Sequence, residues 1–260
     1  MIRAVLPKSR LYEVKAFVFT ANAINRPYSN SQLYRAEKKI GLSRKAASTT
    51  AHDAHLPINL IKREQYWNAN YPHGIADIDP RDIIDADEMG LELEHQNRSF
   101  GKTVVGEQCN RKGAYNRNHK LNVLMAVSGC DVTRSRWSEL WTGEGTTLQR
   151  FYDFIEMIVN DLNDRFPGRT FTFTMDNLNV HKNPLVIGLI LNGGHQVVFR
   201  APYWAVDGAI EYVFNSIHTL LEVLFDNVAN MEELILCVEN IMASMPCFCP
   251  YLEHVGFIYN

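Results

Sequence analysis

Between residues 82 and 225, the hydrophobic period of the sequence switches repeatedly between two residues and about 3.6, and this alternation limits the folds open to the chain. Three strand-like stretches come first, and helices alternate with strands after them. In order, the stretches are DIIDADEMG from Asp82, LELEH from Leu91, KLNVLMAVSG from Lys120, helix 148–162, TFTFTMD ending at Asp176, helix 184–191, HQVVFRAPY from His195 and helix 209–225. This order predicts an α/β protein in which a mixed sheet is flanked by helices.

Charge is distributed unevenly along the 260 residues. Residues 1–64 carry 12 Lys and Arg against 4 Asp and Glu, whereas the other residues carry 14 against 25. The N-terminal segment is therefore basic and suited to a polyanion, and the acidic remainder has carboxylates available for another purpose. A solvated basic face without a partner is the alternative interpretation of the N-terminal charge.

The basic segment has the pattern of two short helices. Apolar residues recur every three or four positions over residues 11–24, and the Asn-Arg-Pro sequence at 25–27 ends that helix. A second helix is expected over residues 32–40, with Ser29 or Asn30 as its N-cap. Two short helices around a tight turn are typical of a helix-turn-helix, although any small helical hairpin shares the pattern.

A helix-turn-helix places its second helix in the major groove of DNA, with flanking residues on the phosphates. The candidates for DNA contact are Arg35, Lys38 and Lys39 on the second helix, with Arg44 and Lys45 just after it. We therefore predict a helix-turn-helix DNA-binding segment over residues 1–45. Residues 46–74 contain few apolar residues and are expected to form an extended linker to a larger domain over residues 75–260.

Three carboxylates of the larger domain fall where strands and helices meet. Asp87 ends the first predicted strand, Asp176 ends the fourth, and Glu211 lies in the first turn of the helix after the fifth. Strand ends in open sheets meet at one edge, so these side chains are expected to converge. Clustered carboxylates repel unless cations neutralise them, and Mg²⁺ or Mn²⁺ prefers such oxygen ligands. A pair of ions held this way supports attack at phosphorus.

The residues around these carboxylates resemble the three signature blocks of mariner-type DDE transposases. The first block is an apolar strand ending in Asp-Glu, the second is Asp-Asn with a His five residues after the Asp, and the third is Pro-Tyr followed by a carboxylate that opens a helix. The matching residues are Asp87 and Glu88, then Asp176, Asn177 and His181, then Pro202, Tyr203 and Glu211. The 34 residues between Asp176 and Glu211 are a spacing characteristic of one main branch of this superfamily.

The resemblance implies a ribonuclease H-like catalytic domain preceded by helix-turn-helix DNA-binding segments. The segment SNSQLYRAEKKIGLSRK from Ser29 is similar to the second of the two helix-turn-helix units that family members usually carry. The implied activity is cutting and joining of DNA phosphodiesters at transposon ends and target sites, with double-stranded DNA as the partner. The implied metal ligands are Asp87, Asp176 and Glu211, which would hold two Mg²⁺ or Mn²⁺ ions.

The sequence departs from the family pattern in the third block. Trp204, Ala205 and Val206 stand where family members carry more prolines, so a less rigid loop before Glu211 is expected. Asp207 is an alternative third ligand. Asp85, which shares a strand face with Asp87, is an alternative first ligand.

Two other functions remain open at this level. One is a catalytically inactive transposase, decayed or adopted by its host, that binds DNA without cutting it. The other is a ribonuclease H-like nuclease acting on RNA:DNA hybrids or structured DNA without strand transfer. The longest aliphatic stretch, LVIGLILN from Leu185, is too short to span a membrane, so no membrane partner is expected. A homodimer is a possible assembly, in the nucleus of a eukaryotic host or otherwise in the cytoplasm.

Overall fold

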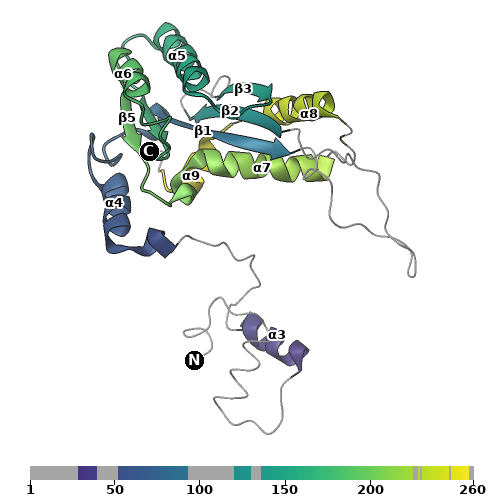
Figure 1. Cartoon of the computed structure of the whole chain (residues 1–260). Helices are drawn as coiled ribbons and strands as arrows, with labels where there is room; N and C mark the ends of the chain where they lie inside the picture. Colours follow the sequence, from purple (N-terminus) through teal and green to yellow (C-terminus); the bar gives the residue numbers. More distant parts are fainter. Residues whose placement is uncertain are drawn as a thin grey trace. The chain divides into compact units, whose positions relative to one another are not determined.

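The computed structural model describes residues 29–39, 52–92, 120–129, 136–224, 228, 230–245 and 247–257 (Figure 1). The chain divides into two compact units, Met1–Thr50 and Ala51–Asn260.

The described part of the first unit is helix α3 (Asn30–Lys39). The Ser29 hydroxyl accepts a hydrogen bond from the backbone N–H of Gln32 at 3.3 Å, and the Ser29 N–H donates to the Gln32 side chain at 2.8 Å. This reciprocal pair is a capping box, and it confirms Ser29 as the N-cap. Arg35, Lys38 and Lys39 are exposed on this helix. The helix expected over residues 11–24, and the basic residues Arg44 and Lys45, lie outside the described residues.

The second unit contains one sheet of five strands in the order β3-β2-β1-β4-β5. The strands are β1 (Ile83–Glu92), β2 (Lys120–Ser128), β3 (Arg136–Thr142), β4 (Thr172–Met175) and β5 (Gln196–Phe199). The pairs β1–β2 and β2–β3 are antiparallel, whereas β1–β4 and β4–β5 are parallel. The sheet is therefore mixed, as predicted.

Two strands differ from the prediction. Leu91 and Glu92 continue β1 instead of opening a strand of their own, because the alternation of LELEH runs on from the preceding residues in one register with β2. Arg136–Thr142, which was not predicted, forms the edge strand β3. Only Trp137 of β3 is fully buried, so its sequence has little of the hydrophobic alternation by which strands are recognised.

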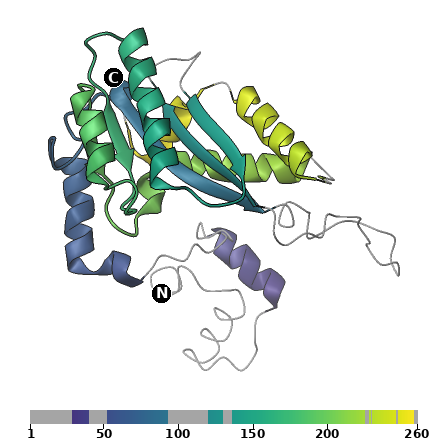
Figure 2. The same ribbon diagram turned by 45° about the horizontal axis from the view of Figure 1, so that its top comes forward.

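Helices cover both faces of the sheet (Figures 1 and 2). Helices α5 (Leu148–Arg165) and α6 (Pro184–Asn192) pack on one face, with Ile84 and Ala86 of β1 in the shared core. Helices α7 (Ala209–Leu224) and α8 (Met231–Ser244) pack on the other, where β1 contributes Leu91. Because strand side chains alternate between faces, Asp85 and Asp87 lie on the α7 side.

Residues 57–68, expected to belong to an extended linker, instead form helix α4 (Pro57–Asn68) within the second unit. Tyr66 is buried, and the Trp67 ring lies 5.4 Å from that of Phe257, just beyond helix α9 (Cys249–Val255). Leu60 and Ile61 remain exposed. The helix therefore lacks the regular apolar stripe that identifies a helix in a sequence, which is why the prediction failed.

The C-terminal helix α8 has apolar residues at helical spacing, and Leu234, Val238 and Ile241 are buried in the core on the α7 side of the sheet. Among the described helices, none alone has the length and apolar character needed to cross a bilayer, and the bent pair of α8 and α9 meets that test by length and composition only.

Candidate active site

Strand register brings two of the predicted carboxylates to the same end of the sheet. The parallel strands β1 and β4 pair as far as Asp85 and Thr174, and two residues further along each are Asp87 and Asp176. The parallel strands β4 and β5 end side by side, and the next residues are Asp176 and Arg200. Residues distant in sequence therefore become neighbours through the hydrogen-bond pattern of the sheet.

Arg200 is a buried cation between two buried carboxylates. Its side chain is 2% exposed, its Nη1 forms an ion pair with Asp85, and its Nη2 lies 2.7 Å from Oδ2 of Asp87. Burial alone would lower the pKa of Arg200, but the negative charges of Asp85 and Asp87 outweigh burial and raise the pKa above its usual value. Arg200 therefore remains positively charged.

The Asp87 carboxylate has a partner on each oxygen. Oδ2 accepts from Arg200, and Oδ1 accepts from the backbone N–H of Glu88 at 2.8 Å. Burial, together with the nearby charge of Asp176, raises the pKa of Asp87 to about 7 in spite of Arg200. The carboxylate is therefore held in a place where a further positive charge would be favourable.

A pocket of about 350 Å³ lies beside Arg200, with Asp176, Glu211, Arg200 and Tyr203 among its lining residues. Glu211 lies in the first turn of α7, as predicted. Burial raises the pKa of Glu211, and the charge of Asp176 acts in the same direction. Two of the predicted ligands therefore share one pocket, next to the arginine that binds the third.

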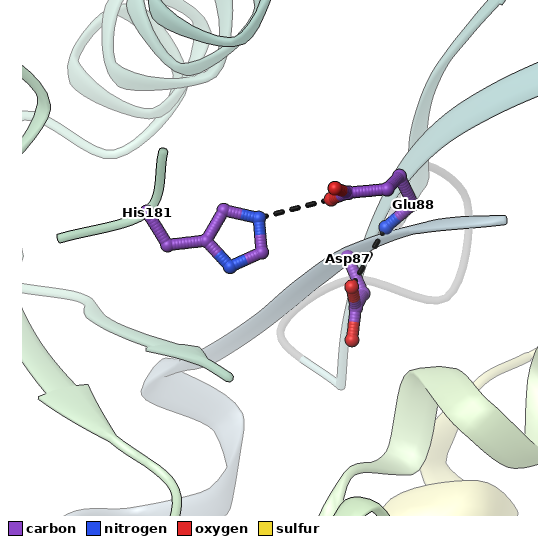
Figure 3. Close-up of side chains that lie close together, drawn as sticks. All are labelled: Asp87, Glu88 and His181. Carbon is purple, nitrogen blue, oxygen red and sulfur yellow. Dashed lines mark hydrogen bonds and ion pairs between the residues drawn. The ribbon is translucent and has the colours of Figure 1, made fainter. Parts of the chain in front are cut away.

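His181 is held between two carboxylates, those of Asp176 and Glu88. Its Nδ1 lies 2.6 Å from Oδ1 of Asp176, and its Nε2 lies 2.9 Å from Oε2 of Glu88. In Figure 3, Glu88 points toward His181, while Asp87 points away from it. Burial alone would lower the pKa of His181, but the two hydrogen bonds raise it to about 9. The imidazolium therefore donates from both nitrogens and orients Asp176.

Among the residues that the structure describes, one group has the compact geometry of a single-ion site. Ligand atoms of Asp87, Glu88 and His181 lie within 4.8 Å of one another. All three side chains already have protein partners: His181 bonds Asp176 and Glu88, and Asp87 bonds Arg200. The predicted triad of Asp87, Asp176 and Glu211 surrounds Arg200 and does not form such a compact group.

The two alternative ligands are both engaged elsewhere. Asp85 accepts hydrogen bonds from the Thr174 hydroxyl at 3.0 Å and from the backbone N–H of Ile210 at 3.0 Å, in addition to its ion pair with Arg200. Asp207 is buried and forms a two-pronged ion pair with Arg63 of α4, at 2.6 and 2.7 Å. Both residues therefore serve the framework of the site.

The loop before α7 is held by contacts that the sequence analysis did not anticipate. The Arg63 guanidinium pairs with Asp207 and lies 3.9 Å from the ring centroid of Trp204. The contacts of Arg63 with Trp204 and Asp207 thus fix the loop against α4, and they restrict the loop in place of the missing prolines. Tyr203, in the same loop, has a positive φ of 67° and a side chain that is 55% exposed at the pocket.

Two functional residues, Arg63 and Arg200, were missed. Arg63 was placed in the linker, and no local pattern connects it to Asp207, 144 residues away. Arg200 had a detectable signal, because it directly follows the apolar strand VVF. A charged residue at the end of a buried strand requires a buried partner of opposite charge.

The chemistry of the predicted ligands fits a hard divalent cation. Asp87, Asp176 and Glu211 offer the carboxylate oxygens that Mg²⁺ and Mn²⁺ prefer. The charge of Asp176 raises the pKa of both other carboxyls, and this repulsion is relieved by positive charge. The guanidinium of Arg200 shows that the space between the carboxylates accepts a cation.

This fold and site define a nuclease of the ribonuclease H-like class. The family model described as DDE superfamily endonuclease matches residues 82–240, which run from the start of β1 into α8 and include all three predicted ligands. The chain belongs to this family. No curated protein sequence matches it significantly.

Solved structures of the Mos1 mariner transposase share the fold of this chain. The paired-end complex with Mn has a TM-score of 0.66 and 14% sequence identity, and the match covers 95% of this chain and 70% of that chain. The pre-cleavage transpososome has a TM-score of 0.65 and 15% identity over 95% and 75%. The catalytic domain alone has a TM-score of 0.56 and 13% identity over 81% and 91%. These similarities confirm the ribonuclease H-like fold that the sequence resemblance implied.

Proposed function

We propose that this protein is a DDE transposase that cuts DNA at transposon ends and joins the freed ends to target DNA. The observation that carries the proposal is the arrangement of Asp87, Asp176 and Glu211 around Arg200 and one pocket, in a chain of the DDE endonuclease family. The structures with the same fold include Mos1 complexes described as paired-end and strand-transfer complexes.

In this proposal, Asp87, Asp176 and Glu211 hold two Mg²⁺ or Mn²⁺ ions; Mos1 paired-end complexes have been solved with each metal. When bound there, such ions would supply the positive charge that lowers the pKa of a water or 3′-hydroxyl and that balances the charge on the leaving oxygen. The protein's own contribution is orientation. His181 fixes the Asp176 carboxylate through its Oδ1, and Arg63 fixes the loop that leads to Glu211 through Asp207.

Double-stranded DNA is the proposed partner, as transposon end and as target. Arg35, Lys38 and Lys39 of α3 are exposed and available for phosphate or base contacts. Arg44 and Lys45 complete the proposed contact set. We propose a homodimer because two ends must be brought together for transposition, and Mos1 structures are described as paired-end complexes. The proposed location is the nucleus of a eukaryotic host, or otherwise the cytoplasm.

The proposal is tested by incubating the full chain with labelled duplex DNA carrying the inverted repeats of its element, with Mg²⁺, Mn²⁺ or EDTA. We expect metal-dependent nicking that Asp176→Ala reduces at least about 100-fold, since a ligand of the reacting centre is lost. Asp164→Ala, at an exposed position on α5, is the matched control and should retain full activity. Cleavage by Asp176→Ala at the wild-type rate would refute the assignment. Stronger cleavage of RNA:DNA hybrids than of duplex DNA would identify a ribonuclease instead.

A second function, DNA binding by an inactive transposase, is favoured by one observation. Both carboxylate oxygens of Asp87 already have hydrogen-bond partners, and one of these partners is the buried cation Arg200. A protein that never loads metal would bind the same inverted repeats in the presence of Mg²⁺ without cutting them. Binding is measured by gel shift alongside the nicking assay, so a single preparation distinguishes the two functions.

A further inference from the structure

We propose that Arg200 competes with divalent ions for Asp87, so that metal loading requires Arg200 to release this carboxylate while remaining bound to Asp85. This inference rests on the proposed function, because the competition matters only if Asp87 is a metal ligand. It identifies a positioning residue that the family resemblance did not include.

The two contacts of the Arg200 guanidinium are unequal in their surroundings. The contact with Asp85 is the more firmly held of the two, because Asp85 also accepts hydrogen bonds from the Thr174 hydroxyl and from the backbone N–H of Ile210 at the start of α7. These additional bonds hold the Asp85 carboxylate in place whatever its neighbours do. Among the described residues, Asp87 by contrast has only the N–H of Glu88 as its other hydrogen-bond donor. The contact with Asp87 is therefore the one that can be exchanged.

Arg200 itself is held from several directions. Its backbone N–H donates to the carbonyl of Met175 at 2.9 Å, and its carbonyl accepts from the Asn177 side chain. Gly208 lies against the guanidinium, where a Cβ would be 2.7 Å from Nη1. Because the guanidinium is planar and rigid, release of Asp87 requires the whole group to rotate about its contact with Asp85 while the backbone of Arg200 stays in place.

The guanidinium also has an unused donor. Its Nε is buried and makes no hydrogen bond to any residue in the described part of the chain. A buried donor without a partner is costly, so Arg200 is not in a fully satisfied position when it contacts both carboxylates.

If Arg200 competes with metal ions, a substitution that weakens the contact between Arg200 and Asp87 should increase the affinity of the protein for metal ions. The experiment measures Mn²⁺ affinity of the full chain by titration calorimetry, without DNA, for wild type, Arg200→Gln and Arg200→Lys. We expect Arg200→Gln to bind Mn²⁺ at least about tenfold more tightly, the factor that corresponds to one charge-assisted hydrogen bond. Arg200→Lys retains the charge but has a single small head that does not span both carboxylates, and we expect a gain of about threefold.

Arg169→Lys is the matched control, since Arg169 pairs with Asp82 outside the site, and its Mn²⁺ affinity should equal that of wild type. Near-ultraviolet circular dichroism establishes that each variant is folded. If Arg200→Gln does not fold, Arg200→Lys decides the question. A folded Arg200 variant whose Mn²⁺ affinity is equal to or weaker than wild type overturns the proposal, because a purely structural arginine would give that result.

Asp176→Ala separates this proposal from the proposed function. If Asp176→Ala abolishes Mn²⁺ binding while the Arg200 variants bind like wild type, the competition is refuted and the metal-dependent function stands. If wild type and all variants bind no Mn²⁺, both the competition and the metal-dependent function are refuted. Binding by Arg200→Gln but not by wild type would support the competition and show that Arg200 keeps this chain unloaded.

Discussion

Among single residues, Asp85 and Asp87 differ in the number of hydrogen-bond donors around their carboxylates, and this difference distinguishes a structural carboxylate from a candidate metal ligand. Asp85 and Asp87 share one face of β1, and their spacing makes them equivalent candidates. In the structure, Asp85 has three partners, among them the N-terminus of α7, whereas Asp87 has two and lies next to Asp176. Asp85 therefore belongs to the framework, and Asp87 remains the predicted ligand.

The protonation of His181 predicts a pH dependence of stability. The folded-state pKa of about 9 lies above the ordinary value of 6.5, so the stabilisation is complete below pH 6.5 and is lost as pH rises through 9. We expect the free energy of unfolding in EDTA to fall by about 2 to 3 kcal/mol between pH 7 and pH 9.5. Because the pKa of Asp87 is raised to about 7, most of the stability change linked to Asp87 occurs below pH 7, and the remainder adds only a small loss just above pH 7. The measurement is urea unfolding across that range.

His181→Gln should remove most of this dependence, whereas His52→Gln, at an exposed position, should leave it unchanged. An unfolding free energy that stays constant from pH 7 to pH 9.5 in wild type would contradict a protonated His181 between Asp176 and Glu88.

At the scale of elements, the start of α7 is built around the side chain of Arg200. Gly208 directly precedes the helix, and its Cα lies so close to the guanidinium that an added Cβ would be 2.7 Å from Nη1 and 2.8 Å from Cζ. The Gly208 φ of −94° is accessible to any residue, so the requirement for glycine is one of space and not of backbone conformation.

Gly208→Ala should therefore destabilise the protein by about 1 to 3 kcal/mol, because a buried ion pair would have to shift to make room. Gly188→Ala, in the middle of α6, is the comparison: its Cβ would meet nothing within 4 Å, and we expect a gain of about 0.5 to 1 kcal/mol. Urea unfolding of both variants measures the difference. Equal stability of Gly208→Ala and wild type would show that the loop before α7 relaxes at no cost.

At the scale of the whole molecule, the second compact unit begins at Ala51, well before the sheet. Helix α4 contributes Tyr66 to a core shared with Ile83 and Leu252, and Arg63 neutralises the buried Asp207. The domain start expected at residue 75 would remove all of these contacts.

A chain of residues 51–260 should therefore fold, whereas a chain of residues 75–260 should be at least about 3 to 5 kcal/mol less stable, the usual cost of leaving a buried charge unpaired. The check is thermal and urea unfolding of the two fragments beside the full chain. Arg63→Gln in the longer fragment isolates the ion pair from the loss of the helix. Two fragments of equal stability would mean that α4 adds nothing to the fold.

Much of the architecture was predictable from local patterns. Strands β1, β2, β4 and β5, helices α5, α6 and α7, the N-cap of α3 and the position of Glu211 at the start of α7 follow from spacing and side-chain chemistry within short stretches. The errors arose where local pattern was weak. Trp137 is the one residue of the edge strand β3 that is buried, so β3 lacks the two-residue alternation typical of a strand. Leu60 and Ile61 of α4 are exposed, so α4 lacks the apolar stripe typical of a helix.

The family resemblance, the fold class and the three candidate carboxylates depend on residue type, order and spacing, so they can be recognised without coordinates. The pairing of buried charges cannot be recognised in that way: Arg200 pairs with Asp85 and Asp87, and Arg63 pairs with Asp207. Ion pairs in a buried site act over a few ångströms in space, whereas these partners are separated by more than a hundred positions along the chain.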